Sequence, residues 1–200
     1  MSVKKMFLPS FILLIVAFAI ALLPTDKEGA IYTDTLRLHI LAESDSEEDQ
    51  RVKLKIRDAV LLEYGEELKN SGYEEAVKNT GERLGEIEDF VNRELTDLGY
   101  GSTASVSLSE EWYDTRVYED FTLPCGYYTS LRIVIGSGAG QNWWCVMYPP
   151  LCLDLATETA PPDDAAIDYS SEEIALISKD GYNIKFKLLE VFSDAFSKKG

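Results

Sequence analysis

The stretch Leu36-Arg-Leu-His-Ile-Leu-Ala-Glu-Ser-Asp-Ser-Glu-Glu-Asp-Gln-Arg-Val-Lys-Leu-Lys55 decides how this chain folds. In its first half, apolar residues alternate with Arg37 and His39, a period of two that is typical of a strand with one buried face. The alternation stops where Ser44 or Asp45 is expected to accept a hydrogen bond from the first free N–H groups of a helix. Acidic side chains in that first turn also interact favourably with the helix dipole. The stretch therefore predicts a strand that leads, through a short polar turn, into a capped helix.

This turn is a candidate functional site. A strand that ends in a polar turn brings Arg37, His39, Glu43 and Asp45 towards one corner of the molecule, and Ser44 of the same turn is a further candidate for partner binding. Such corners often carry binding residues. A purely structural connection between a strand and a helix explains the same residues equally well, so both interpretations stay open.

The composition limits the class of partner. The chain has 200 residues, of which 46% are hydrophobic, enough for one domain with appended segments. Its formal charge of −16 argues against binding to nucleic acid, because few Lys and Arg residues are present to displace counterions from phosphates. The same charge argues against peripheral binding to an anionic lipid surface.

The N-terminal segment, residues 1–23, predicts an export signal peptide or a membrane anchor. Lys4 and Lys5 precede an apolar run that continues to Leu23. A positive segment followed by an apolar one is typical of a signal peptide, and Ala19 and Ala21, with one residue between them, offer a cleavage site. The run is also close to the ~20 residues that span a bilayer. Whether it is cleaved or retained, the rest of the chain is expected outside the cytoplasm.

The remaining sequence predicts one α+β domain between flexible segments. Residues 24–32 are a polar linker, residues 33–153 the main domain, residues 154–171 an acidic linker rich in Pro and Ala, and residues 172–200 a C-terminal segment. In the main domain, helical spacing over two long stretches is followed by several alternating stretches. This order predicts an antiparallel sheet with two long helices packed on one face, behind the N-terminal signal or anchor helix.

A hairpin is expected between strands at 127–135 and 142–148, with the glycine-rich loop 136–140 as its turn. The expected register places Ile133 opposite Trp144, which makes Trp144 a core residue. Strand alternation then points Trp143 to the other face. There Trp143 is either covered by another element or exposed as part of a partner-binding surface.

The three cysteines, Cys125, Cys145 and Cys152, predict one disulfide and one remaining thiol if the domain is exported. The hairpin register slightly favours Cys125 with Cys152. A fold back across the Pro149-Pro150 turn would pair Cys145 with Cys152 instead, so the pairing stays open.

No cofactor is expected, and no metal site, because one histidine and three dispersed cysteines lack the spacing of zinc ligands. An alternative function is an extracytoplasmic cysteine hydrolase acting on peptide or cell-wall material. It would use Cys145 as nucleophile and His39 as base, with Asp45 orienting the ring.

Two stretches carry a family resemblance: Arg37 to Val60, and Val134-Ile-Gly-Ser-Gly-Ala-Gly-Gln-Asn-Trp-Trp-Cys-Val-Met-Tyr-Pro-Pro-Leu-Cys152. Together they closely resemble the stage II sporulation protein R family, over roughly residues 33–154. Glu43 stands where the family pattern leads us to expect Asn, which weakens a functional role for that side chain.

The resemblance implies a sporulation signalling protein without catalytic activity, secreted into the space between forespore and mother cell. There it would act as a protease activator on a membrane-embedded aspartic protease of the mother cell, leading to sigma factor processing. We hypothesise that Trp143, the 136–140 loop and the corner with Arg37, His39 and Asp45 contact this protease. Only the N-terminal segment is expected to touch a membrane.

Overall fold

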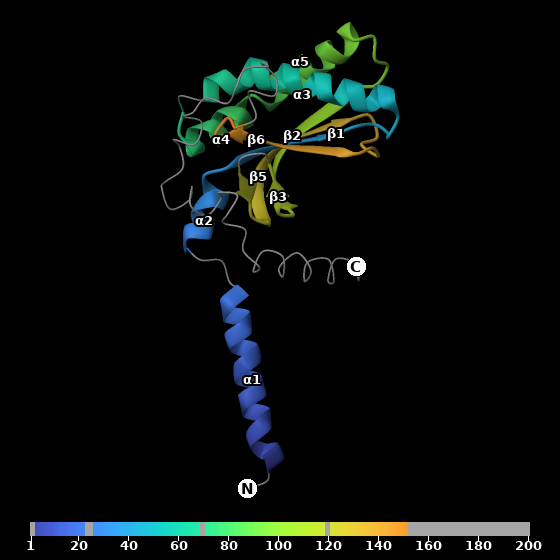
Figure 1. The fold of residues 1–200 in the computed structure, drawn as a ribbon. Coiled ribbons are helices and arrows are strands. Elements are labelled where there is room, and N and C mark those ends of the chain that lie inside the picture. Colours follow the sequence, from blue (N-terminus) through green and yellow to red (C-terminus); the bar gives the residue numbers. More distant parts are fainter. Residues whose placement is uncertain (1–2, 23–25, 69–70, 119–120, 152–200) are drawn as a thin grey trace.

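The fold is an α+β arrangement in which helices cover one face of a twisted sheet (Figure 1). The structure is a computed structural model, and it describes residues 3–22, 26–68, 71–118 and 121–151. The elements are α1 (Val3–Leu22), α2 (Asp26–Thr33), β1 (Leu36–Leu41), α3 (Glu47–Leu68), α4 (Tyr73–Glu82), α5 (Leu84–Asp97), β2 (Ala104–Tyr113), β3 (Arg116–Val117), β4 (Thr122–Leu123), β5 (Gly126–Ile135) and β6 (Asn142–Tyr148).

The sheet is mixed, which corrects the antiparallel sheet expected from the sequence. Its order is β2-β5-β1-β6, and β1 pairs parallel with β5 and antiparallel with β6. A parallel pair needs a long crossover connection, and here α3, α4, α5 and the strands β2, β3 and β4 lie between β1 and β5 in the chain. Five of the six residues of β1 are buried, as is usual for a central strand with both faces covered.

The hairpin expected between 127–135 and 142–148 is wrong. Strand β1 lies between β5 and β6, so that Ile40 is paired with Ile133 on one side and with Trp143 on the other. The loop from Gly136 to Gln141 therefore crosses the end of β1 instead of forming a tight turn. The local signal, two alternating stretches around a glycine-rich loop, cannot reveal a third strand that comes from a hundred residues earlier.

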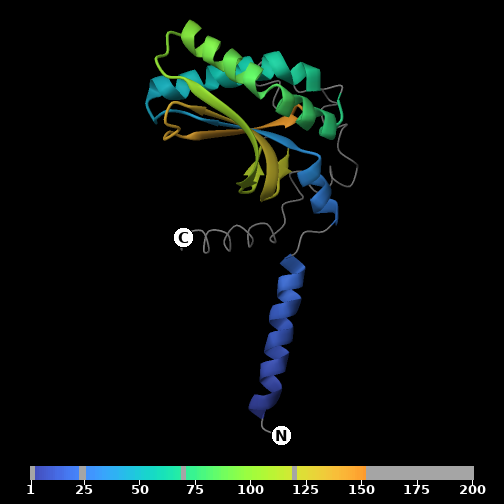
Figure 2. The same cartoon turned by 180° about the vertical axis from the view of Figure 1, so that it is seen from behind.

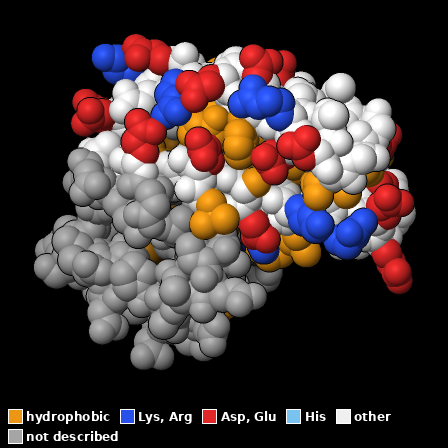
Figure 3. All heavy atoms as spheres, turned by 90° about the horizontal axis from the view of Figure 1, so that it is seen from above, with side chains coloured by type: hydrophobic (Ala, Val, Ile, Leu, Met, Phe, Trp, Pro, Cys, Tyr) orange, Lys and Arg blue, Asp and Glu red, His pale blue; other side chains and the backbone are white. Residues whose placement is uncertain are grey.

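The helix layer is formed by α3, α4 and α5. The first of the two expected long helices is α3, but the second is divided into α4 and α5 at Arg83, whose backbone leaves the helical region with φ −106° and ψ 12°. The Arg83 guanidinium joins Glu67 of α3 and Glu86 of α5, so this break is held by ion pairs on the protein surface. Seen from the helix side, Lys and Arg are interspersed with Asp and Glu (Figure 3).

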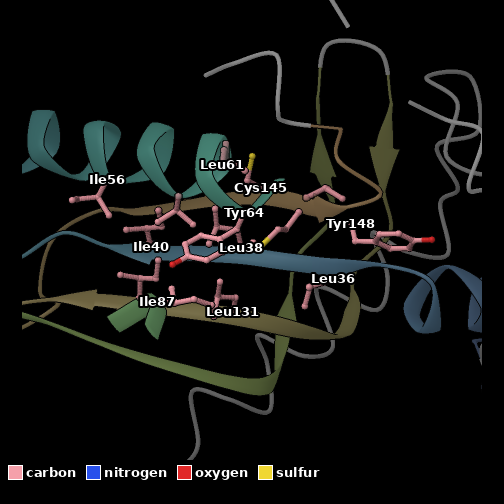
Figure 4. Packing of buried hydrophobic residues seen from close by; sticks show 14 of the residues in the cluster. Leu36, Leu38, Ile40, Ile56, Leu61, Tyr64, Ile87, Leu131, Cys145 and Tyr148 are labelled. Atoms are coloured by element: carbon pink, nitrogen blue, oxygen red, sulfur yellow. The ribbon is translucent and has the colours of Figure 1, made fainter. Parts of the chain in front are cut away.

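The core lies between the helices and the sheet. Leu38 and Ile40 of β1 and Leu131 of β5 meet Ile56 and Leu61 of α3, all almost inaccessible to solvent (Figure 4). Burying each such side chain contributes about 1.5–3 kcal/mol to folding. The alternation of β1 thus directs Arg37 and His39, which stand between these apolar residues, to the opposite side of the sheet.

The segments before β1 differ from the expected linker. Residues 26–33 form α2, and Ile31 of α2 is fully buried because α2 packs against β5. No helix in the described part of the chain is both long enough and apolar enough to cross a membrane. The signal or anchor at residues 1–23 stays a prediction, and the segments 154–171 and 172–200 lie outside the described residues.

Candidate functional site

The face of the sheet opposite the helices carries the candidate site. It presents Arg37 and His39 of β1, together with Trp144 of β6, because these residues alternate with the core positions. The short β3–β4 ribbon lies on this side of the sheet, away from the helices (Figures 1 and 2). On this face Arg37 is fully buried, whereas His39 keeps 12% of its side chain exposed and marks the more open end.

Arg37 is fully buried beneath the ribbon. Its Nε donates to the carbonyl oxygen of Cys145 at 3.0 Å, and its Nη2 donates to the hydroxyl of Tyr118 at 2.8 Å. The guanidinium also lies 4.2 Å from the ring centre of Tyr113 and 5.1 Å from that of Tyr128. Its Nη1 is buried and has no hydrogen-bond partner among the described residues. Arg37 is therefore a buried cation held by aromatic rings and two hydrogen bonds.

The tyrosines around Arg37 do not neutralise it. Burial raises the pKa of Tyr113 and of Tyr118 above the ordinary value, although the nearby Arg37 charge opposes this rise. Both hydroxyls thus stay protonated at neutral pH. No carboxylate in the described part of the chain forms an ion pair with Arg37, so the sequence-based candidate Arg37 is a buried, uncompensated charge and not a surface contact.

His39 is the centre of the more open end. Its Nδ1 lies 2.9 Å from Oε2 of Glu111, and its Nε2 lies 3.0 Å from Oδ1 of Asn142. The imidazole stacks on Trp144, with ring centres 5.6 Å apart and planes 16° apart. Glu111 also approaches Nε of Arg132 at 3.4 Å. Both ring nitrogens of His39 are thus engaged, which fixes the orientation of the ring.

Glu111 is held in its charged form. Burial tends to raise the pKa of Glu111. The hydrogen bond to His39 and its charge lower this pKa, and so do the hydrogen bond to Ser130 and the charge of Arg132. Together they outweigh burial, so the pKa lies below its usual value. A carboxylate at this position is stable at neutral pH and accepts a hydrogen bond from His39. The pair is a charged, oriented element of the open face.

Beside this cluster, a cavity of about 290 Å³ lies between β3 and β6. Arg116 places its guanidinium 3.6 Å from the ring centre of Trp144. The lining residues are Arg116, Val117, Tyr118, Asn142, Trp143, Trp144 and Cys145. The volume is near the lower end of the range for ligand sites, and the lining is mainly aromatic with a few polar groups.

The two tryptophans have the opposite orientation to the one expected. Trp143 turns towards the helix layer, where the guanidinium of Arg57 on α3 lies 4.6 Å from its ring centre. Trp144 faces the other side with His39. The expected hairpin register made Trp144 the core residue, and the insertion of β1 shifts the pairing so that Trp143 shares a face with Ile40.

Ser44 and Asp45 do not cap α3 in the expected way. The hydroxyl of Ser46 accepts the N–H of Asp49 at 3.1 Å and therefore caps the helix. Ser44 accepts the N–H of Ser46 and donates to the Asp49 carboxylate at 2.5 Å. Asp45 accepts the N–H of Gln141 at 2.8 Å, so it joins the turn after β1 to the loop before β6.

The glycine-rich loop fits closely against that turn. Gly140 donates its N–H to the carbonyl of Ala42 at 2.9 Å, and Ser137 donates its hydroxyl to the carbonyl of Glu43 at 3.0 Å. A Cβ on Gly140 would lie 2.2 Å from the carbonyl oxygen of Ser44, so only glycine permits this approach. Gly136 and Gly138 have positive φ values of 57° and 63°, which also favour glycine. The loop thus joins the predicted corner, although it forms no hairpin turn.

The structure contradicts the Cys145–His39 pair. Cys145 is disulfide-bonded, and it lies among Leu38, Leu61 and Tyr64 on the helix side (Figure 4). His39 alternates with these core positions along β1 and therefore faces away from the helices, where it stacks on Trp144. A thiolate at Cys145 next to His39 is therefore not available for the hydrolase mechanism.

Cys125 is buried and takes no part in a disulfide, which overturns the slight preference for its pairing with Cys152. Cys152 lies outside the described residues. In the described ranges, no group of three or more His, Cys, Asp or Glu residues could hold a metal ion.

Sequence reasoning missed four members of the site: Glu111, Arg116, Tyr118 and Asn142. The alternation of β2 does place Glu111 on the polar side of its strand, but nothing local indicates that β2 lies two strands away from His39. Arg116 and Tyr118 reach the site only because the ribbon folds over the sheet.

Comparison with known proteins gives a consistent assignment. The family model described as "Stage II sporulation protein R" matches residues 32–158. A relative, stage II sporulation protein R of Bacillus subtilis (strain 168), is 32% identical over 182 residues, covering 81% of this chain and 81% of that protein. No solved structure matches. The matched region contains β1 to β6 and every residue of the site, and the chain belongs to the stage II sporulation protein R family.

Proposed function

We propose that this chain is an exported signalling protein that activates a membrane-embedded aspartic protease of the mother cell, leading to processing of a pro-sigma factor. A sporulation role follows from the family. The location between the two sporulation membranes, the protease partner and the processing step are the proposed parts. The observation that carries the proposal is the family match across the whole described sheet.

The open face of the sheet is the contact surface that we propose for the protease. In it, the ring of Trp144 contacts both His39 and Arg116. Trp, Tyr and Arg are the residues most enriched in the energetic centres of protein interfaces. Of the candidates from the sequence, His39 belongs to this surface and Trp143 to the adjoining cavity. Ser44 and Asp45 form hydrogen bonds in the neighbouring turn after β1, and Arg37 is buried beneath the surface.

Binding at such a surface activates the protease only if the active state of the protease is bound more tightly than the inactive state. A signal of this kind acts in proportion to its amount, whereas an enzyme converts many molecules of its target. This difference gives the experiment that tests the proposal.

The full-length protein is titrated into vesicles that contain the protease and its pro-sigma substrate, and the processed product is measured at each ratio. We expect processing to saturate near one signalling protein per protease. Processing that is absent at every ratio would refute the proposal, and complete processing by a trace amount would indicate enzymatic turnover instead.

A matched pair of variants tests the surface. Trp144→Ala removes the ring that contacts both His39 and Arg116, and we expect at least a tenfold higher concentration to be needed for half-maximal processing. Trp112→Ala is the control, because Trp112 is also partly exposed but makes an edge-to-face contact with Tyr127 of β5, away from this surface. Equal titration curves for the two variants would remove Trp144 from the contact.

A further inference from the structure

The outer edge of β2 is covered only at its start. Strand β2 forms one side of the sheet and, in the described part of the chain, pairs with β5 alone (Figure 2). The N–H of Ala104 donates to Oδ1 of Asn92 at 2.8 Å. Two residues later, the N–H of Val106 donates to Oε2 of Glu88 at 2.9 Å. Side chains of α5 therefore occupy the first two outward-facing positions of this edge.

The second half of the same edge is open. Backbone groups of an edge strand alternate between the neighbouring strand and the outside, so the outward N–H of Val106 fixes the same direction for every second residue after it. These residues are Leu108, Glu110 and Trp112. No described residue accepts a hydrogen bond from their N–H groups. An edge of this kind is a template for an added strand.

Two exposed aromatic rings lie beside the open half of the edge. Trp112 is 36% exposed and Tyr127, its partner on β5, is 63% exposed. Their ring centres are 5.3 Å apart and the planes are at 72°, an edge-to-face contact. An apolar side chain of an added strand, placed opposite Trp112, would cover part of both rings. Exposed aromatic side chains are often the energetic centres of protein interfaces.

The charge of this edge limits its occupant. Residues 104–114 contain Glu110, Glu111 and Asp114 and no Lys or Arg. Glu111 is bonded to His39, whereas Glu110 and Asp114 are exposed. A second copy of the chain would bring the same carboxylates close together across the new strand pair, and like charges in opposite positions destabilise such a pair. A basic side chain opposite Glu110 would instead form a cross-strand pair of opposite charge.

This edge is separate from the surface that we propose for the protease. Strands β5 and β1 lie between β2 and β6, the strand that carries Trp144. The two surfaces also differ in charge, because Trp144 contacts the guanidinium of Arg116, whereas the β2 edge exposes carboxylates. Segments of opposite charge therefore suit the two surfaces.

We infer that the β2 edge from Leu108 to Trp112 binds an extended basic segment of a partner protein other than the protease. The segment adds to β2 as an antiparallel strand and places Lys or Arg opposite Glu110. A neighbouring apolar side chain of the segment packs on Trp112 and Tyr127. This inference goes beyond the proposed function, because it assigns a second binding surface to a partner of different chemistry.

A pair of N-methylated peptides tests strand addition. The probe is a fluorescent, end-capped peptide in which threonines alternate with valine, lysine and valine, so that lysine stands at the centre. With lysine opposite Glu110 in an antiparallel pair, the N–H groups of lysine and both valines face β2, and those of the two inner threonines face away. Binding to the full-length protein is measured by fluorescence anisotropy.

N-methylation of both valines should weaken binding of this peptide at least tenfold, because two backbone hydrogen bonds to β2 are lost. N-methylation of the two inner threonines adds the same groups to the outer side and should change binding less than twofold. Equal effects of the two modifications, or no binding of the unmodified peptide, would overturn the inference.

Two substitutions test the preference for a basic segment. A peptide with glutamate in place of lysine should bind the wild-type protein at least threefold more weakly, because its charge is repelled by Glu110. Glu110→Gln should reduce this difference to less than twofold, whereas Asp97→Asn, which removes an exposed charge from α5, should preserve it. A difference that survives Glu110→Gln would overturn the inference.

The two tryptophan variants separate this edge from the protease surface. Trp112→Ala should weaken binding of the lysine peptide at least fivefold, and Trp144→Ala should leave it unchanged. In the vesicle titration the order is reversed, since Trp112→Ala should follow the wild-type processing curve. Unchanged peptide binding by Trp112→Ala would overturn the inference, and a shifted processing curve for this variant would assign the edge to the protease and overturn the separate partner.

Sedimentation velocity of the full-length protein, with and without the lysine peptide, tests whether a second copy occupies the edge. We expect the peptide to leave the oligomeric state unchanged. Dissociation of an oligomer by the peptide would place a second copy at β2 and overturn the inference.

Discussion

Gly140→Ala is the substitution whose effect the structure defines most sharply. A Cβ on residue 140 would lie 2.2 Å from the carbonyl oxygen and 2.5 Å from the carbonyl carbon of Ser44. These are backbone atoms, so no side-chain rotation relieves the contact. The loop 136–141 has to move away from the turn after β1 by about 1 Å to reach an ordinary contact distance.

That movement disrupts the hydrogen bonds between the loop and the turn. Residues 139–141 donate three of them, to the carbonyls of Glu43 and Ala42 and to the Asp45 carboxylate, at 3.2, 2.9 and 2.8 Å. Each contributes about 1 kcal/mol to stability, so the substitution should lower the free energy of unfolding by about 3 kcal/mol. With a urea m-value of about 2 kcal/mol/M, the unfolding midpoint should fall by about 1.5 M.

Urea unfolding of the full-length protein, followed by tryptophan fluorescence, measures this shift. Gly85→Ala is the matched control, because a Cβ at Gly85 in α5 meets nothing within 4 Å. Alanine there should stabilise the protein by about 0.4–1 kcal/mol, since it restricts the unfolded chain and favours the helix. If Gly140→Ala unfolded at the wild-type midpoint, the close contact between loop and turn would be refuted.

Three further predictions follow from the same contacts. Arg37→Met leaves the carbonyl of Cys145 and the hydroxyl of Tyr118 without their donor and should lower the free energy of unfolding by about 2–4 kcal/mol. Arg93→Met, at an exposed position of α5, should change it by less than about 0.5 kcal/mol in the same urea titration. The hydrogen bond to His39 helps to lower the pKa of Glu111 in the folded protein below its unfolded value near 4.5. The stabilisation that results should therefore be fully present above pH 4.5. It should disappear as the pH falls through the lower pKa of the folded protein. Urea midpoints measured between pH 3 and 6 should therefore converge at the acidic end for wild type and Glu111→Gln, and parallel curves would contradict this. Asn92→Ala removes two hydrogen bonds, of 2.8 and 3.0 Å, between the Asn92 side chain on α5 and the backbone of Ala104 at the start of β2. It should lower the free energy of unfolding by about 2 kcal/mol. Amide hydrogen exchange at the start of β2 should be faster than in wild type. Unchanged exchange there would contradict it.

The elements themselves were largely predictable from the sequence. The period of two over residues 36–41 and the helical stretch that follows appear as β1 and α3, because these patterns arise from which side chains a single element buries. The prediction of one long second helix was wrong at Arg83, where ion pairs to Glu67 and Glu86 form at the point where the helix divides. Such a break depends on a neighbouring helix and is not visible within one window of sequence.

The candidate site was only partly predictable. His39 was correctly placed on the polar side of β1, and Asp45 does meet the glycine-rich loop. The partners of His39 were not foreseen, because Glu111 and Asn142 come from strands 72 and 103 residues away. The two tryptophans were exchanged between faces by the same error, since a strand inserted between β5 and β6 changes which residue stands opposite which.

The sequence alone determined the local periodicity of β1 and α3, the presence of a loop at the glycine-rich stretch 136–140, the strongly acidic charge and the family to which the chain is similar. Those properties depend on neighbouring residues or on the chain as a whole. Only the tertiary structure decided that β1 is central and parallel to β5, that Cys145 is buried away from His39, and that Arg37 is a buried cation without an ion-pair partner among the described residues. The reason is that strands pair through backbone N–H and C=O groups, which every strand carries. The backbone therefore does not say which strand pairs with which. That choice is made only when segments far apart in the chain bury their side chains together.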